Sequence, residues 1–375
     1  MMKSEEIIPV NLGDRSYEIC VGSGILETIG VSLLKRFGVR KIFIVTDHEV
    51  ATHWLGLVVA SIKKVGLKYE VASIPSGEGS KSFYQLEGLL NQFFEARIAR
   101  DGLIVALGGG VVGDLAGFAA AVALRGVDFV QVPTTLLAQV DSSVGGKTAI
   151  NTAQGKNLVG SFYQPRLVLI DTDVLGTLPQ RQILSGYAEI VKYGLIKNRQ
   201  FFEWLEVNGK KILSGDTEAR RTAIVESCKT KAAIVGDDEK ETGERAILNF
   251  GHTFGHAFEA EAKFNGDLLH GEAVALGMMA ALKLSKITGI CNGQEVDRVN
   301  FHLQSVGLPV NLSFLDKFSG WNVDALVKHI GHDKKVLDGK IRFILLKEIG
   351  NSFITSEVDP NNVSAVISQS LEGRL

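Results

Sequence analysis

The chain has 375 residues, of which 45% are hydrophobic and 22% are charged, and its formal net charge is −2. A length of this order predicts one large domain or two ordinary ones, and either arrangement buries a full core. The nearly balanced charge gives no reason to expect nucleic acid or an anionic membrane as a partner. An anionic ligand would therefore have to be met by a local concentration of cations.

Cysteine usage and the start of the sequence bear on the cellular compartment. Cys20, Cys228 and Cys291 lie far apart, in neither metal-like nor redox-like spacing, which indicates buried thiols of the reducing cytoplasm. The charged first residues are followed by no apolar secretory core, so we expect no signal peptide. Residues 102–124 are apolar enough to resemble a membrane helix, but a glycine triplet and Asp114 favour a buried strand, turn and helix.

The first half of the chain alternates short β-branched runs with segments of helical spacing. Residues 41–46, 103–107, 129–132 and 168–171 are predicted strands, and residues 83–96 and 111–124 are predicted helices. Such an alternation predicts a parallel sheet with helices on its faces.

The pattern changes near residue 180. Helical spacing then dominates, at residues 186–196, 218–235, 252–261 and 272–287, and residues 341–346 are the main predicted strand. The expected architecture is an α/β N-terminal domain, residues 1–180, followed by a mostly α-helical C-terminal domain, residues 181–375.

Two glycine-rich segments are candidate ligand loops. Residues 108–113 fit the pattern G-x-G-x-x-G between a predicted strand and a predicted helix, where backbone N–H groups approach a pyrophosphate. A tight turn between strand and helix explains this pattern equally well, because no acidic residue that could hold a ribose follows at the distance usual for dinucleotide-binding proteins. Residues 141–148 resemble a nucleotide phosphate loop but have Asp141 where that pattern needs glycine. What remains is a loop that presents Lys147, followed by Lys156 and Asn157, and it suits an anionic, oxygen-rich ligand.

Three of the eight histidines lie in one short stretch. His252 and His256 share a face of a predicted helix, and His270 stands just ahead of the next one. Imidazoles with a carboxylate suit zinc or a similar first-row ion that keeps a position open for substrate. No glutamate directly follows His252, which argues against a zinc protease. Spacing leaves open which histidines bind metal and which transfer protons, and histidines that cap helices are the structural alternative.

Cationic residues recur beside these motifs, several of them in apolar or small-residue surroundings. The set is Arg125, Lys147, Lys156, Lys192, Lys231, Arg245, Lys334 and Lys335. A surface charge is the simpler interpretation of any single one. Together they predict a substrate with more than one anionic group, such as a phosphate and a carboxylate.

Five ordered segments, residues 108–117, 133–157, 186–192, 248–256 and 269–272, resemble signature blocks of the 3-dehydroquinate synthase family of sugar phosphate cyclases. The likeness extends from about Asp47 to Gly350. It implies a cytoplasmic homodimer with its active site between a dinucleotide-binding domain and a helical domain. It also implies NAD+ and one divalent ion, Zn2+ or Co2+, as cofactors.

The resemblance assigns roles by position. Glu189, His252 and His270 match the metal ligands, and His256 matches a residue for substrate binding and proton transfer. The substrate-binding positions are Asp141, Lys147, Lys156, Asn157, Lys192, Lys231, Arg245 and Asn249, with Lys334 or Lys335 at the phosphate and Arg125 from a neighbouring subunit. Of these, Lys147, Asn157, Lys192, Lys231, Arg245 and Asn249 are expected to act in catalysis with His256. The NAD positions are Asp47, Glu78, Lys81, Gly109, Gly110, Val111, Asp114, Thr134, Thr135, Thr177 and Leu178, joined by Lys147 and Lys156. Gln182 departs from the family, which often has glutamate there.

The implied reaction belongs to the shikimate pathway and converts 3-deoxy-D-arabino-heptulosonate 7-phosphate to 3-dehydroquinate. The substrate alcohol is oxidised transiently, phosphate is eliminated, the ketone is reduced again and an intramolecular aldol reaction closes the ring. Another sugar phosphate cyclase is disfavoured by the identities of Lys231, Asn249 and His256. An amino-sugar variant stays open. A metal-dependent polyol dehydrogenase would leave the cations unexplained, and a non-enzymatic binding protein would explain fewer motifs still.

Overall fold

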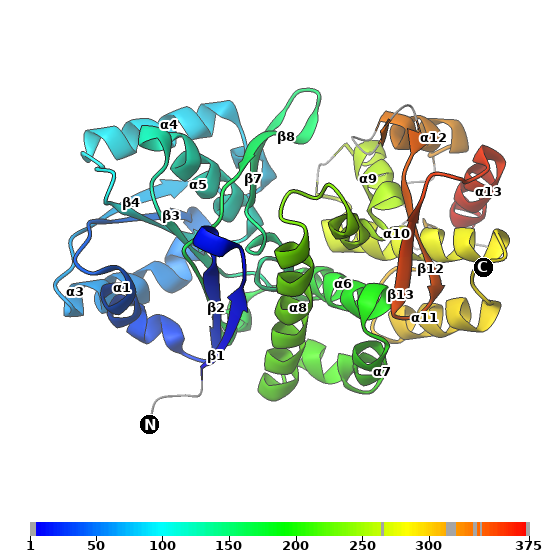
Figure 1. The fold of residues 1–375 in the computed structure, drawn as a ribbon, viewed down its shortest axis with the longest axis horizontal. Coiled ribbons are helices and arrows are strands. Elements are labelled where there is room, and N and C mark those ends of the chain that lie inside the picture. Colours follow the sequence, from blue (N-terminus) through cyan, green and yellow to red (C-terminus); the bar gives the residue numbers. More distant parts are fainter. Residues whose placement is uncertain (1–4, 264–265, 313–319, 333–335, 338–339, 373–375) are drawn as a thin grey trace. The chain divides into compact units, whose positions relative to one another are not determined.

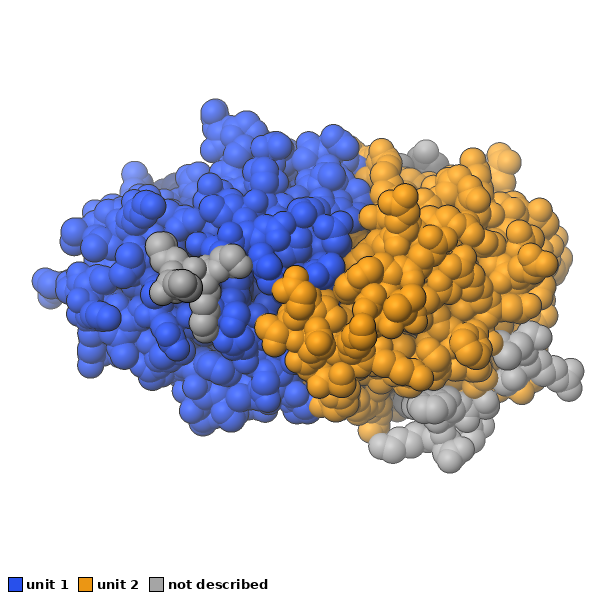
Figure 2. Space-filling model, turned by 90° about the horizontal axis from the view of Figure 1, so that it is seen from below, with its two compact units in different colours: residues 1–179, 220–240 blue, residues 180–219, 241–375 orange. Residues whose placement is uncertain are grey.

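The structure is a computed structural model that describes residues 5–263, 266–312, 320–332, 336–337 and 340–372. The chain forms two compact units, coloured separately in Figure 2. Unit 1 comprises Met1–Pro179 and Arg220–Lys240, and unit 2 comprises Gln180–Ala219 and Glu241–Leu375. The division near residue 180 resembles the expected boundary, but Arg220–Lys240 returns to unit 1 instead of staying with the helical half.

Unit 1 is built on a seven-stranded sheet with the order β1-β2-β9-β6-β5-β3-β4. Figure 1 labels its strands β1, β2, β3 and β4. The strands are β1 (Glu6–Val10), β2 (Tyr17–Gly22), β3 (Ile42–Asp47), β4 (Tyr69–Ile74), β5 (Leu103–Gly108), β6 (Phe129–Pro133) and β9 (Leu167–Asp171). Every neighbouring pair is parallel except β1 and β2. The predicted parallel sheet is therefore confirmed, while β1, β2 and β4 were not predicted.

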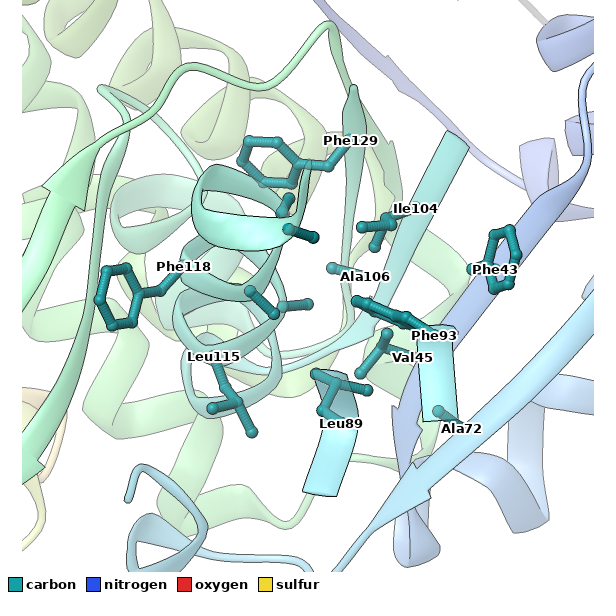
Figure 3. Packing of buried hydrophobic residues seen from close by; sticks show 14 of the residues in the cluster. Phe43, Val45, Ala72, Leu89, Phe93, Ile104, Ala106, Leu115, Phe118 and Phe129 are labelled. Atoms are coloured by element: carbon teal, nitrogen blue, oxygen red, sulfur yellow. The ribbon is translucent and has the colours of Figure 1, made fainter. Parts of the chain in front are cut away.

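Helices cover both faces of this sheet because its central strands are apolar on both faces. Alternate residues of a strand point to opposite sides, so Phe43 and Val45 of β3 pack under α4 (Phe83–Glu95) and α5 (Gly110–Val122). The intervening Ile42 and Ile44 pack against α1 (Ile29–Phe37) and α3 (Gly56–Lys64). Figure 3 shows the first cluster, with Phe93 of α4 beside Val45.

The order of the strands creates a switch point between β3 and β5. From β3 the chain moves outward to β4, and it then crosses to β5 and continues to β6 in the opposite direction. In open α/β sheets, ligands bind outside the carboxyl ends of the strands at such a point. Asp47 ends β3 and Gly108 ends β5, so both lie at this edge.

Two further elements complete unit 1. A hairpin of β7 (Lys147–Thr152) and β8 (Gly155–Phe162) packs against α5. The long helix α8 (Thr217–Asp237) belongs mainly to unit 1 because Lys229 pairs with Glu6 of β1 at 2.9 Å. The Cys228 thiol also donates to the Gln139 carbonyl oxygen at 3.3 Å.

Unit 2 is mostly helical, as expected. Its helices are α6 (Gln180–Lys197), α7 (Arg199–Ser214), α9 (His252–Glu261), α10 (His270–Ile287), α11 (Gly293–Ser305), α12 (Val323–His332) and α13 (Pro360–Leu371). Its strands form two hairpins, β10 (Val336–Leu337) with β11 (Lys340–Ile341) and β12 (Phe343–Glu348) with β13 (Asn351–Thr355). Helix α10 is central, since residues 271–285 are all buried and the helix contacts α6, α9, α11 and α13.

Short helical segments join these elements. They are Gly13–Arg15, Ile25–Thr28, His48–Val50 (α2), Ala51–Leu55, Glu78–Ser80, Ala123–Arg125, Ala138–Ser142, Thr172–Thr177 and Glu244–Asn249. Residues 102–124 form β5, α5 and their connections, which confirms the strand, turn and helix expected there. Within the described ranges, no helix is both long and apolar enough to cross a bilayer. All three cysteines are buried and free, as expected.

Candidate active site

Three helices of unit 2 bring together one carboxylate and two imidazoles. Glu189 of α6, His252 of α9 and His270 of α10 place their ligand atoms within 4.8 Å of one another. Nε2 of each histidine lies 3.5 Å from Glu189 Oε1. Glu189 is fully buried, and neither of its oxygens accepts a hydrogen bond of normal geometry from a described residue. A buried carboxylate in this position fits a divalent ion with one oxygen and two nitrogen ligands.

One face of α6 fixes the start of α10, where His270 is the first residue. Arg181, Ser185 and Glu189 follow one another at intervals of four residues and so share that face. The Ser185 hydroxyl accepts the Gly271 N–H at 3.0 Å. The backbones approach so closely that a Cβ at Gly271 would lie 1.9 Å from the Ser185 carbonyl oxygen. The helix that supplies one ligand therefore also sets the backbone position of another.

A second contact between α6 and α10 involves charge. Glu272 Oε2 accepts the backbone N–H of Leu269 at 2.8 Å, which closes the first turn of α10. Arg181 holds both carboxylate oxygens of Glu272, with its Nε and Nη2 each 2.7 Å away. His270 stands between Leu269 and Glu272, so this network restrains its backbone from both sides.

The position of His252 depends on a close approach of α9 and α10. Gly251 precedes His252 with a φ of 82°, in the left-handed region that favours glycine. At Gly277 of α10, a Cβ would lie 2.0 Å from the Gly251 carbonyl oxygen. Two glycines thus allow the helices to cross at the point where His252 begins α9.

The other nitrogen of each imidazole is also engaged. His252 Nδ1 lies 3.2 Å from the Phe250 carbonyl oxygen, and His270 Nδ1 lies 3.1 Å from Glu259 Oε2. These contacts leave Nε2 of both rings directed at Glu189. Burial opposes a positive charge on His270, but Glu259 and Glu189 outweigh it and raise the pKa of the imidazole to about 10. The two carboxylates therefore favour positive charge at the His270 ring.

His256 lies one turn further along the same face of α9. Its ring centroid is 5.4 Å from that of His252 and 6.2 Å from that of His270. His256 is only partly buried and is not a member of the three-residue metal group. This position suits a residue that contacts a small molecule bound beside the ion.

Two cationic side chains of unit 2 are almost completely buried, which is unusual for lysine and arginine. Lys192 and Arg245 are each 1% exposed. Lys192 lies one turn after Glu189 on α6 and contacts Glu189 Oε2. Arg245 belongs to the segment Glu244–Asn249, which contacts α6 and directly precedes α9. In the same segment, the Asn249 amide donates to the carboxylate of Glu241. Of these residues, Lys192 contacts the metal group directly, and Arg245 and Asn249 lie in the segment that leads to α9.

Residues of unit 1 that were predicted to bind substrate or NAD form two polar clusters. In one, Lys231 Nζ of α8 lies 2.6 Å from both Asp141 Oδ1 and the Asp141 carbonyl oxygen. In the other, Lys81 Nζ lies 2.6 Å from Asp114 Oδ2 and 2.5 Å from Asn157 Oδ1.

The hairpin residues differ in exposure. Lys147 is exposed at the start of β7, and Lys156 is partly buried on β8. Asn157 adopts a φ of 55° beside Lys156. This left-handed conformation suits asparagine better than most residues.

The predicted NAD residues lie along the carboxyl edge of the sheet. Gly109 caps α5 without a side chain, so its first-turn N–H groups stay open to an anion at the end of β5. Beyond β6, the Thr134 N–H donates to the Gly108 carbonyl oxygen at 3.0 Å. The Thr134 hydroxyl is buried without a hydrogen-bond partner among the described residues. An open helix N-terminus beside an unsatisfied hydroxyl fits a diphosphate group.

Other predicted NAD residues already have protein partners. Asp47 Oδ1 accepts the N–H groups of residues 49 and 50 and the Ser76 hydroxyl, and its other oxygen takes no part in these bonds. Glu78 accepts from the Asn151 amide at 2.7 Å. Thr177 accepts from the Trp54 indole at 3.2 Å, shortly before Leu178. Gly110 and Val111 begin α5, and Thr135 follows Thr134.

The remaining predicted residues stand apart. Arg125 is exposed, and within the described ranges it has no ion pair. It ends a strained turn, since Leu124 and Arg125 have φ values of 51° and 67°. Lys334 and Lys335 lie outside the described residues.

The sequence reasoning missed three charged side chains: Glu241, which contacts Asn249, Glu259, which contacts His270, and Arg181, which contacts Glu272. Glu259 had a detectable signal, because it lies seven residues after His252 on the same helical face. Glu241 and Arg181 had none, because their partners Asn249 and Glu272 are brought near only by the tertiary fold.

The fold and the metal group together define a dehydroquinate synthase-like protein, with an α/β parallel-sheet domain and a helical region. Family models described as 3-dehydroquinate synthase N-terminal and C-terminal match residues 71–185 and 186–336. The chain belongs to the 3-dehydroquinate synthase family. It is 51% identical over 361 residues to the 3-dehydroquinate synthase of Rhodospirillum rubrum, which covers 96% of this chain and 94% of that relative.

Two solved structures are also similar. A 2-deoxy-scyllo-inosose synthase complexed with carbaglucose-6-phosphate, NAD+ and Co2+ has a TM-score of 0.85 at 28% identity, covering 97% of this chain and 100% of that one. A 2-epi-5-epi-valiolone synthase from Streptomyces hygroscopicus subsp. jinggangensis, with NAD+ and Zn2+ bound, has a TM-score of 0.86 at 25% identity, covering 95% and 97%.

Proposed function

We propose that the chain converts 3-deoxy-D-arabino-heptulosonate 7-phosphate to 3-dehydroquinate and phosphate, as a phosphate-eliminating carbon–oxygen lyase of aromatic amino acid biosynthesis. The carrying observation is the Glu189, His252 and His270 group with the buried cations Lys192 and Arg245 in the same helical unit. Curated 3-dehydroquinate synthases half identical over nearly the whole chain support the same activity. A polyol dehydrogenase would not need buried cations.

The cofactors are NAD+ and one divalent ion, Zn2+ or Co2+, as in the similar solved cyclases. When bound, they supply reversible hydride transfer and polarisation of the substrate oxygens. Glu189 and Nε2 of His252 and His270 hold the ion in unit 2. Unit 1 holds the dinucleotide along its carboxyl edge, where Gly109 and Thr134 leave donors for the diphosphate.

The remaining NAD contacts come from the same edge and from the hairpin of unit 1. We assign them to Asp47, Glu78, Lys81, Gly110, Val111, Asp114, Thr135, Thr177 and Leu178, with Lys147 and Lys156.

Cationic and amide side chains hold the substrate. Its phosphate and carboxylate attract Lys147, Lys156, Lys192, Lys231 and Arg245, while Asp141, Asn157 and Asn249 bind its hydroxyl groups. Because Lys192 and Arg245 are buried, their attraction for an anion is less screened than at the surface. His256 transfers the proton, since its ring lies beside both histidine ligands and stays partly accessible.

We further propose a cytoplasmic homodimer. Val122, Leu158 and Phe162 are 42–45% exposed on α5 and β8, two elements that pack together near Arg125. A second copy would cover this apolar surface, and Arg125 would then reach the substrate of the partner. Free, buried cysteines suit the reducing cytoplasm.

A direct assay tests the proposed reaction. The full chain is incubated with the heptulosonate phosphate, catalytic NAD+ and Zn2+, and both inorganic phosphate and NADH are followed. We expect phosphate release without net accumulation of NADH. Steady NADH production without phosphate would indicate a dehydrogenase instead. A parallel reaction with the amino analogue of the substrate distinguishes the amino-sugar variant, which would turn over the analogue faster.

A further inference from the structure

The two histidines of the metal group differ in what their second ring nitrogen contacts. His252 Nδ1 faces a neutral backbone oxygen, that of Phe250, at 3.2 Å. His270 Nδ1 faces a carboxylate, that of Glu259, at 3.1 Å. Glu259 is 4% exposed, so its charge is shielded little by solvent. The Nε2 atoms of the two imidazoles would therefore differ in the electron density that they offer to an ion.

We propose that Glu259 is a positioning residue of the metal centre. Its carboxylate accepts the Nδ1–H of His270, keeps that tautomer, and directs the Nε2 lone pair to the ion with more negative charge than His252 receives. The inference rests on the proposed metal centre and extends it to a residue that does not itself bind the ion.

The geometry separates the fixing of the backbone from the fixing of the ring. Contacts from Ser185 and Arg181 of α6 restrain the backbone around His270. They leave the side-chain torsions of His270 free, and it is Glu259 of α9 that contacts the ring. Orientation of an imidazole by a buried carboxylate is a recurring arrangement in metal sites.

The placement of Glu259 on α9 supports the same role. His252, His256 and Glu259 occupy one helical face at intervals of four and three residues. Because α9 packs along α10, this face meets the start of α10, where His270 stands. Glu259 contacts Nδ1, whereas Glu189 faces Nε2 on the other side of the ring, so the two carboxylates cannot bind the same ion through this geometry.

Burying a carboxylate is costly unless the charge is compensated. A position beside His270 offsets that cost, because the ring donates a hydrogen bond and an ion beyond it adds positive charge. Replacement of such an outer carboxylate typically lowers metal affinity about 10- to 100-fold.

Helix α9 offers a matched control. Glu261 lies two residues beyond Glu259 and makes the same kind of contact, with Oε2 2.9 Å from Nε2 of His329, which is not in the metal group. The experiment compares the full-length wild type, Glu259→Gln and Glu261→Gln. Each protein is stripped with a chelator and titrated with Zn2+ or Co2+ alone. The readouts are the dissociation constant, the Co2+ absorption bands, the solvent exchange of the His270 Nδ1–H in the Zn2+ form, and thermal unfolding of the stripped protein.

We expect Glu259→Gln to lower the affinity for both ions about 10- to 100-fold. We also expect it to shift the Co2+ bands and accelerate exchange of the Nδ1–H, while the stripped protein unfolds at the wild-type temperature. Glu261→Gln should match the wild type in every metal readout. The role of Glu259 would be overturned if Glu259→Gln kept the wild-type affinity and spectrum, or if Glu261→Gln lost as much metal affinity. Neither result would contradict the metal centre itself. A wild-type chain that binds no ion would overturn the metal centre itself.

Discussion

Arg181 of α6 and Glu272 of α10 form a two-point ion pair in which both nitrogen–oxygen distances are 2.7 Å. The same guanidinium donates to the Asp267 carbonyl oxygen at 2.6 Å, in the segment that leads to His270. Glu189 lies on the same helix as Arg181. The helix α6 therefore carries one metal ligand and also anchors the segment that leads to another, His270.

Arg181→Gln should therefore weaken both stability and metal binding. We expect the free energy of unfolding to fall by about 1 kcal/mol, because the pair is partly exposed. The affinity for Zn2+ should fall as well. Arg298→Gln is the control, since Arg298 makes a similar two-point pair with Glu206 on other helices of unit 2. Denaturant unfolding and Zn2+ titration distinguish them, and an equal metal defect in Arg298→Gln would contradict the assignment.

Gly271→Ala tests the contact of α6 with α10. The added methyl group would lie 1.9 Å from the Ser185 carbonyl oxygen, so the helices must separate. We expect a loss of about 1–3 kcal/mol in unfolding free energy together with weaker metal binding. Gly331→Ala on α12 is the control, because nothing lies within 4 Å of its added methyl group. If Gly271→Ala kept wild-type stability, the close approach would be wrong.

His270→Ala should remove the ion and the activity while the fold is kept, because the buried residues 271–285 still pack α10 against its neighbouring helices. Metal content after gel filtration, circular dichroism and phosphate release measure the three properties. His329→Ala is the matched control from the same unit. Wild-type metal content in His270→Ala would exclude His270 from the ligand set.

Lys147→Met should raise the KM for the heptulosonate phosphate far more than it raises the Kd for NAD+. Lys147 is exposed at the start of β7, and its main assignment is to the anionic groups of the substrate. Titration of NAD+ by fluorescence and steady-state kinetics separate the two effects, with the surface variant Lys35→Met as control. Equal losses for both ligands would contradict this division of roles.

His302 predicts a pH dependence of stability. Burial lowers its pKa to about 4, and its Nε2 lies 3.0 Å from the Tyr187 hydroxyl. The unfolded chain takes up this proton near pH 6.5, whereas the folded chain resists it until about pH 4. Stability from this group is therefore complete above pH 6.5 and is lost as the pH falls toward 4, by about 1.4 kcal/mol per unit.

His302→Gln should remove that part of the pH slope. Urea unfolding of wild type and variant between pH 7 and pH 4.5 gives the difference, in which all other titrating groups cancel. Parallel slopes would show that His302 does not carry the effect.

Much of the sheet could be predicted because its central strands are buried on both faces. A strand such as β5 is apolar at every position, and that run is visible in the sequence. The edge hairpin of β1 and β2 escaped notice, because Ile7 is exposed while Ile8 is buried and Pro9 interrupts the pattern. The membership of α8 was also not predictable, since it depends on distant partners such as Glu6 and Asp141.

For the site, spacing alone reached the histidines but not their roles. The i, i+4 pair His252 and His256 shares a face, yet the structure groups His270 and Glu189 with His252 instead. That selection follows from the crossing of α6, α9 and α10, which no local pattern encodes. The resemblance to the family supplied it, and the buried state of Lys192 and Arg245 became visible only in the fold.

The return of residues 220–240 to unit 1 has a consequence for synthesis on the ribosome. The last strand of the sheet ends at Asp171, but Glu6 and Asp141 meet their partners Lys229 and Lys231 only on α8. Domains generally fold as units while the chain emerges from the N-terminus. The nascent sheet therefore lacks these two ion pairs until the chain has grown through α8. A fragment that stops after β9 should be aggregation-prone, and the two units should not be separable by a single cut.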